Sequence, residues 1–125
     1  MDFIIGGAYQ GKLAYAKNKY SLSGDQIFAC TEDKGIEFGR RCICEIQEYT
    51  LYCVKNGIDA LGVFRAHRGE WKDSVLICED IFCGVVPLGA DMRAWRELTG
   101  RLCAYLSQEA ESVTRIFCGL EQRLK

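Results

Sequence analysis

Several residue types on which common protein classes depend are scarce in this sequence. Its 125 residues include one proline, Pro87, and one histidine, His67. The single proline argues against proline-rich linkers. The single histidine has no cysteine near it in sequence, which leaves little support for a zinc site. No apolar run reaches the ~18 residues that a membrane-spanning helix needs, so we expect no contact with a membrane.

The charges show no excess of either sign. Sixteen basic residues face seventeen acidic ones, which gives a formal net charge of −1. This balance predicts no electrostatic attraction to nucleic acid or to an anionic membrane surface. The first residues, Met1 to Gly6, carry no basic leader and only a short apolar run, so we expect no signal peptide and a cytoplasmic location.

Cysteine, by contrast, is abundant. Eight cysteines are present, none of them in a Cys-x-x-Cys arrangement, and the closest pair is Cys42-x-Cys44. A disulfide framework needs a secretory context, and several of these cysteines lie inside apolar runs such as Val75 to Cys78. We therefore interpret them as reduced side chains that act as small hydrophobes in the core of a cytoplasmic protein.

Apolar segments of strand length alternate with segments of helical periodicity along the chain. The predicted strands are 2–5, 26–30, 74–78 and 113–118. The predicted helices are 12–20, most of 41–55, 59–67 and 90–109. An apolar loop is predicted over 81–88. Such alternation is typical of an α/β layer fold with a mostly parallel sheet, and the length suits a single domain, 1–125.

One glycine-rich segment lies between the first predicted strand and the first predicted helix. It has the Gly-x-x-x-x-Gly-Lys spacing of a phosphate-binding P-loop. The segment consists of Gly6, Gly7, Ala8, Tyr9, Gln10, Gly11, Lys12 and Leu13. Glycines let consecutive backbone N–H groups point toward phosphate oxygens, the following helix presents its N-terminal dipole, and Lys12 supplies a mobile cation. The segment therefore predicts a phosphate-binding loop, and a glycine turn that binds nothing is the alternative.

Metal binding beside this loop depends on other residues. Leu13 stands where a P-loop enzyme places the serine or threonine that holds Mg²⁺, and leucine has no oxygen to offer. Glu79 and Asp80 follow the predicted strand 74–78, and a carboxylate at such a strand end beside a P-loop often holds the metal ion. We take Asp80 and Glu79 as candidate ligands of Mg²⁺; the alternative is two solvated carboxylates at a strand end.

Four segments of the chain resemble the pattern of one family. Residues 4–12 are similar to a strand followed by Gly-Gly-Ala-x-x-Gly-Lys-Ser, and residues 79–87 are similar to Asn-Glu-Val-Gly-x-Gly-Ile-Val-Pro. Residues 93–101 are similar to Arg-x-Phe-Arg-Asp-x-x-Gly-Arg, and residues 117–125 are similar to Ser-Gly-Leu-Pro-Leu-Arg-Leu-Lys. Over residues 1–20 and 74–125 the chain thus resembles the adenosylcobinamide kinase/adenosylcobinamide-phosphate guanylyltransferase family of cobalamin biosynthesis.

The resemblance implies a P-loop nucleoside triphosphate hydrolase-like, RecA-like three-layer fold, reduced in size. Members of this family bind ATP or GTP, phosphorylate a hydroxyl of adenosylcobinamide and form homo-oligomers. By resemblance, residues 6–13 would bind the nucleotide, Lys12 and Asp80 would be catalytic, and Asp80 and Glu79 would hold Mg²⁺. The histidine that the family guanylylates has no counterpart in the corresponding region, so the resemblance supports phosphoryl transfer to a corrinoid alcohol more than guanylyl transfer.

Two functions of different classes remain open. The first is a nucleoside-triphosphate-dependent kinase of the adenosylcobinamide kinase type. The second is a catalytically inactive module that binds a nucleotide or another anion and has a regulatory or assembly role, which Leu13 and the missing histidine favour. A purine nucleotide is the expected partner in both, with ATP and GTP not distinguished.

Overall fold

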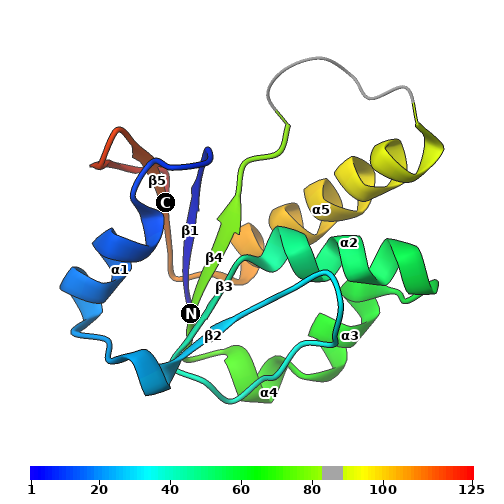
Figure 1. Cartoon of the computed structure of the whole chain (residues 1–125). Coiled ribbons are helices and arrows are strands. Elements are labelled where there is room, and N and C mark those ends of the chain that lie inside the picture. The colour runs from blue at the N-terminus through cyan, green and yellow to red at the C-terminus, as the bar shows by residue number, and fades with distance from the viewer. Residues whose placement is uncertain (83–88) are drawn as a thin grey trace.

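The chain forms one sheet with helices on both of its faces (Figure 1). The structure is a computed structural model that describes residues 1–82 and 89–125. Its strands are β1 (Asp2–Gly6), β2 (Ile27–Ala29), β3 (Cys42–Cys44), β4 (Val75–Glu79), β5 (Ser112–Phe117) and β6 (Leu120–Arg123). Its α-helices are α1 (Lys12–Tyr20), α2 (Ile46–Asn56), α3 (Ala60–Ala66), α4 (Arg68–Trp71) and α5 (Ala90–Glu109).

The sheet is mostly parallel, as the alternation of segments predicts. Within the described residues the strand order is β2-β3-β4-β1-β5-β6. Strand β1 pairs in parallel with β4 and β5, and β3 pairs in parallel with β2 and β4. Strand β6 returns antiparallel to β5. The predicted α/β fold with a mostly parallel sheet is therefore confirmed.

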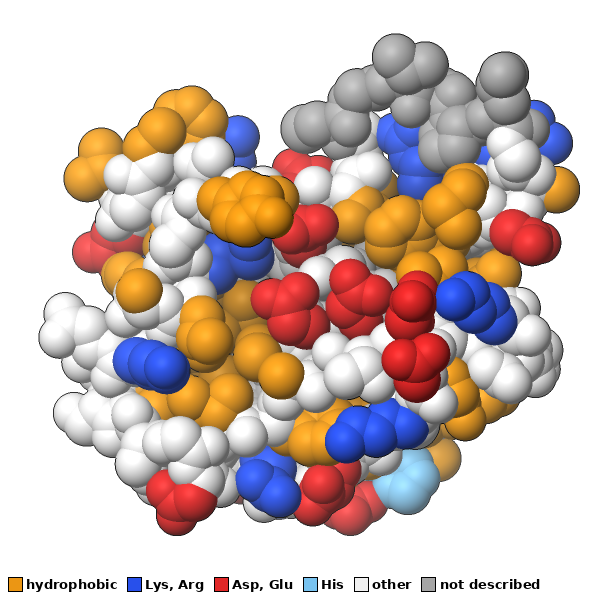
Figure 2. All heavy atoms as spheres, viewed as in Figure 1, with side chains coloured by type: hydrophobic (Ala, Val, Ile, Leu, Met, Phe, Trp, Pro, Cys, Tyr) orange, Lys and Arg blue, Asp and Glu red, His pale blue; other side chains and the backbone are white. Residues whose placement is uncertain are grey.

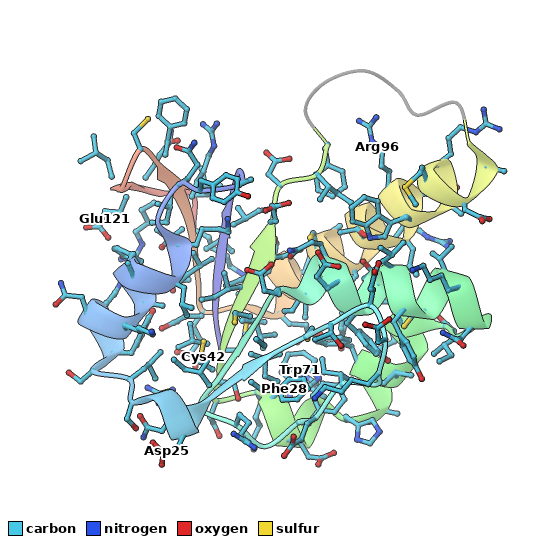
Figure 3. The ribbon with its side chains drawn as sticks, viewed as in Figure 1. Asp25, Phe28, Cys42, Trp71, Arg96 and Glu121 are labelled. Atoms are coloured by element: carbon cyan, nitrogen blue, oxygen red, sulfur yellow. The ribbon has the colours of Figure 1, made fainter. Side chains whose placement is uncertain are left out.

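Two apolar cores, one on each face of the sheet, hold the layers together. Neighbouring residues of a strand point to opposite faces, so Phe3 enters the larger core and Ile4 the smaller one, each only 1% exposed. The larger core packs the sheet against α2, α3, α4 and α5, and both Phe28 and Trp71 belong to it (Figure 3). The smaller core packs the sheet against α1 through Ala16. Burial on both faces explains why the central strands are continuously apolar.

The prediction of a helix over most of 41–55 is wrong at its start. Residues Cys42–Cys44 are strand β3, buried between β2 and β4, and the helix begins only at Ile46. Glu45 separates the two elements because its backbone is left-handed, with φ of 57°, a conformation that a continuous helix does not contain.

Other predicted elements agree closely with the structure. Helix α5 spans the predicted 90–109, and α3 begins after Asp59, whose carboxylate accepts a hydrogen bond from the Gly62 N–H, as expected of an N-cap. Helix α4 and strand β6 were not predicted. Strand β6 forms because Cys118 and Gly119, both with positive φ, make the tight turn of a hairpin.

Two further predictions concern the loop over 81–88 and membrane-spanning helices. The predicted apolar loop over 81–88 lies outside the described residues from Cys83 onward. Among the helices of residues 1–82 and 89–125, none combines the length and the apolar character required to cross a membrane.

Candidate phosphate-binding site

The glycine-rich segment lies at the carboxyl end of β1, next to β4. The helices that follow these two strands lie on opposite faces of the sheet. Strand β1 leads into α1 on the face of the smaller core, whereas the helix that follows β4 in the chain, α5, covers the face of the larger core (Figure 1). The two strands are neighbours, and Gly6 pairs with Glu79 at their carboxyl ends. Neighbouring parallel strands whose helices leave to opposite faces open a crevice at their carboxyl ends, which is the usual ligand site of such sheets.

Gly6 brings the end of β1 directly against its neighbours. A Cβ atom at this position would lie 2.5 Å from the carbonyl oxygen of Ile116 on β5, so only glycine permits this approach. On the other side, the Asp80 N–H donates to the Gly6 carbonyl oxygen at 2.7 Å. The loop therefore starts from a backbone position fixed by strands on both sides.

The rest of the loop is tied to the turn between β5 and β6. The Gln10 side-chain oxygen accepts from the Cys118 N–H at 2.5 Å, and its carbonyl oxygen accepts from the Gly119 N–H at 2.9 Å. Gly11, with φ of 90°, turns the chain into α1, whose first hydrogen bond runs from the Tyr15 N–H to the Gly11 carbonyl oxygen. Tyr9 lies fully exposed in the loop with φ of 58°.

Lys12 folds back over this loop. Its side chain is buried, with 9% of the residue exposed, and its ammonium donates to the Gly7 carbonyl oxygen at 2.7 Å. Helix α1 has no acidic residue in its first turn and no side-chain cap, so its first N–H groups stay available to an anion. The strand, loop and helix predicted over residues 2–20 are thus present, with the cation beside the loop backbone.

A pocket of about 240 Å³, called the loop pocket below, lies between this loop and the ends of β3 and β4. Its lining residues are Tyr9, Gln10, Gly11, Lys12, Leu13, Ala14, Cys44, Glu45 and Ile77. Pockets that enclose a whole small molecule usually measure ~300–1,000 Å³. The loop pocket therefore matches a group of phosphates better than an entire nucleotide.

Glu45 is the carboxylate at this pocket that the sequence analysis missed. It follows the last residue of β3, is exposed, and accepts a hydrogen bond on Oε2 from the Gln47 side-chain amide at 2.5 Å. The signal for it was the alternation of Cys42, Ile43 and Cys44. As a strand, this segment places the next residue at the carboxyl edge of the sheet, beside the loop.

Glu79 and Asp80 lie at the end of β4, as predicted, and both are partly buried. The Glu79 N–H donates to the Gln47 side-chain oxygen at 2.9 Å, and one Asp80 carboxylate oxygen accepts from the Phe82 N–H at 3.0 Å. The structure brings the Asp80 backbone to Gly6. Among the described residues, however, the carboxylate in the lining of the loop pocket is Glu45.

Acidic side chains gather next to the pocket. Burial raises the pKa of Glu48, and the nearby charges of Glu32, Glu45 and Glu79 raise it further. Figure 2 shows acidic side chains close together near the middle of the face that it presents. Burial, followed by the Glu45 charge, also raises the pKa of Cys44 to about 11, so this thiol is neutral at neutral pH and is a poor nucleophile.

The donors beside the loop fit Mg²⁺ only in part. Leu13 packs against the smaller core and lines the pocket without an oxygen atom, whereas Glu45 offers a carboxylate. Within residues 1–82 and 89–125, no group of three or more His, Cys, Asp or Glu side chains forms a ready-made metal site. Mg²⁺ is commonly held by one or two carboxylates together with substrate phosphates and water, and Glu45 supplies one such carboxylate.

Compared with protein-family models and with curated proteins, the chain matches neither a family nor a curated protein.

Proposed function

We propose that the protein binds the phosphates of a purine nucleoside triphosphate, ATP or GTP, at residues 6–13. One observation carries this proposal: a Gly-x-x-x-x-Gly-Lys loop joins β1 to α1 at the point where the connections of the sheet diverge. That strand, loop and helix, with helices on both faces of the sheet, also support a P-loop nucleoside triphosphate hydrolase-like fold of the RecA-like type, reduced in size.

Different groups of the loop and its surroundings would contact different parts of the ligand. The backbone N–H groups of residues 7–11 and the first turn of α1 face the phosphate oxygens. Lys12 exchanges its bond to the neutral Gly7 carbonyl for a bond to an anionic oxygen, which is the stronger of the two. Glu45 would hold Mg²⁺ together with the phosphates, and the bound ion would offset the negative charge shared by the nucleotide and the acidic residues nearby.

A calorimetric titration with ATP and with GTP, each with and without Mg²⁺, tests this proposal. Lys12→Ala removes a hydrogen bond to a charged group, worth about 1.5–3 kcal/mol, so we expect binding to weaken by about 10–100-fold. Lys17→Ala is the matched control, because Lys17 lies on the same helix and is exposed. Absence of binding at millimolar nucleotide, or equal affinity for wild type and Lys12→Ala, would refute the proposal.

Phosphoryl transfer to a corrinoid alcohol is the activity that the family resemblance supports, with Lys12 and Asp80 as catalytic residues. The second candidate is a module that binds nucleotide without turnover, and Leu13 favours it because the residue after Lys12 brings no oxygen to the pocket. Incubation with adenosylcobinamide and ATP or GTP, followed by mass spectrometry, separates the two. A phosphorylated corrinoid supports the kinase, and nucleotide binding without that product supports the module.

A further inference from the structure

We propose that Gln47 is a positioning residue that holds the Glu45 carboxylate at the loop pocket and connects it to Trp95 on α5. The proposal rests on the proposed function, because it concerns the carboxylate that binds Mg²⁺ there. Gln47 lies in the first turn of α2 and is only 2% exposed, so its amide group has little freedom to exchange partners with water.

The Gln47 amide joins the ends of two neighbouring strands. Its oxygen accepts from the Glu79 N–H at the end of β4, at 2.9 Å, and its NH₂ group donates to Glu45 Oε2 after β3, at 2.5 Å. These partners fix the orientation of the amide, because a backbone N–H requires an oxygen and a carboxylate requires an N–H donor. Gln47 therefore offers the carboxylate a donor whose place is set by the sheet.

The position of Glu45 itself adds to this restraint. Its backbone is left-handed between β3 and α2, which sets the direction in which its side chain leaves the chain. A glutamate side chain otherwise loses rotamer freedom, at a cost in free energy, when it becomes ordered. A donor already in place before metal arrives lowers the cost of ordering, which is the usual role of residues behind a metal ligand.

On its other side, Gln47 is held by α5. The indole N–H of Trp95 donates to the Gln47 carbonyl oxygen at 2.8 Å, and the Thr50 hydroxyl donates to the same oxygen at 2.9 Å. Thr50 and Thr99, both fully buried, share a hydrogen bond of 2.7 Å between α2 and α5. Each hydroxyl has one proton to donate, and Thr99 also bonds the Trp95 carbonyl oxygen at 2.7 Å, so the two hydroxyls share their protons among three hydrogen bonds. We expect a change at Glu45 to reach the surroundings of Trp95 through Gln47, whose side chain contacts the first and whose carbonyl oxygen contacts the second.

Nucleotide titrations with and without Mg²⁺ test the positioning role. Gln47→Met removes both bonds at nearly the same size, and Gln47→Glu keeps the acceptor for Glu79 but replaces the donor to Glu45 with a like charge. We expect each variant to reduce the Mg²⁺-dependent gain in nucleotide affinity by about 10–100-fold, as loss of a residue behind a metal ligand does. Gln122→Met, on the exposed strand β6, is the control.

A double-mutant cycle separates this role from a purely structural one. Glu45→Gln alone should lose the same Mg²⁺-dependent gain, and the Glu45→Gln/Gln47→Met pair should lose no more than either single variant, because the two residues act as one unit. A structural role would lower the melting temperature and leave the ratio of Kd without and with Mg²⁺ at its wild-type value.

Trp95 fluorescence gives a second readout that needs no change at Gln47. The sequence has two tryptophans, so Trp71→Phe leaves Trp95 as the sole emitter. Mg²⁺ with nucleotide should shift its emission, and Glu45→Gln should abolish the shift. A Mg²⁺ gain that persists in both Gln47 variants overturns this inference alone, and so does an emission shift that persists in Glu45→Gln. Absence of nucleotide binding overturns the proposed function, and this inference with it.

Discussion

At the scale of single residues, the missing side chain of Gly6 determines how β1 meets β5. The carbonyl oxygen of Ile116 occupies the space that a Cβ atom would need. At Gly7, the next residue, the nearest atom to such a Cβ would be Gln10 Cγ at 3.6 Å, an ordinary contact. Two consecutive glycines therefore have different roles: the first permits close packing, and the second belongs to the loop.

We predict that Gly6→Ala destabilises the protein and Gly7→Ala does not. The added methyl group at residue 6 meets backbone that cannot rotate away, so the free energy of unfolding should fall by about 1–3 kcal/mol, as in other overpacked sites. Denaturant unfolding of both variants and of wild type measures the difference. Equal stability of the two variants would show that β1 and β5 do not approach as closely as described.

At the scale of elements, the Asp2 carboxylate joins β1, α1 and β5. One oxygen accepts from the Tyr20 hydroxyl at 2.7 Å and the other from the Ser112 hydroxyl at 2.8 Å. Burial opposes ionisation of Asp2, but the hydrogen bonds from Tyr20 and Ser112 and the charges of the N-terminus and Lys19 outweigh it. The net result is a pKa below its usual value.

This lowered pKa predicts a pH-dependent contribution to stability. Ionised Asp2 stabilises the fold above the pKa of the unfolded chain, ~3.9 for aspartate, and the contribution is lost as pH falls through the lower pKa of the folded state. Asp2→Asn should therefore be less stable than wild type at pH 7, and the gap should narrow below pH ~4. Thermal unfolding of both proteins from pH 7 to pH 3 measures it, and a constant gap would contradict the assignment.

The elements also show where sequence alone suffices. Helix α5 was predicted with its full length because its apolar residues recur at helical spacing over many turns. Strand β3 was assigned to a helix because only Cys42–Cys44 alternate and helical spacing follows at once. Strand β6 has four exposed residues, so no burial pattern marks it, and its pairing depends on the hairpin turn.

Some residues of the candidate site could also be predicted from the sequence, and others could not. The proposed phosphate-binding loop is contiguous in sequence, so its glycines and Lys12 were recognised from spacing alone. Glu45 reaches the loop pocket only because β3 pairs with β4, a contact between distant segments that no local pattern encodes. Gln47 was missed for the same reason, since its partners Glu45 and Glu79 are brought together by the sheet.

At the scale of the whole molecule, most of the cysteines lie in the two apolar cores. Of the seven that the structure describes, six are buried and Cys118 is exposed; Cys83 lies outside the described residues. Burial, with the neighbouring Cys44 next, raises the pKa of Cys42 to about 12, and the hydrogen bond with Cys103, with burial next, raises that of Cys78. The interpretation of cysteines as small core hydrophobes is confirmed for these six, and Cys118 departs from it.

We predict that alkylation in the native state distinguishes these cysteines. Iodoacetamide at neutral pH should modify Cys118 rapidly, because thiolate formation and access both limit the reaction. The six buried cysteines should react only when the protein unfolds. Peptide mass spectrometry after brief labelling, with and without denaturant, measures each site, with Cys118→Ser as control. Rapid labelling of Cys42 or Cys78 in the native protein would contradict the packing described.

The central position of β1 in the sheet has a consequence for folding. Asp2 and Ser112, which meet across β1 and β5, are separated by 110 residues in the chain, and closing so long a loop is slow. The loop after β1 also takes two of its hydrogen bonds from Cys118 and Gly119. We therefore expect the loop after β1 to reach its final shape only once β5 and the turn that follows it are in place, so phosphate binding, as proposed for this loop, would report that the whole sheet has assembled.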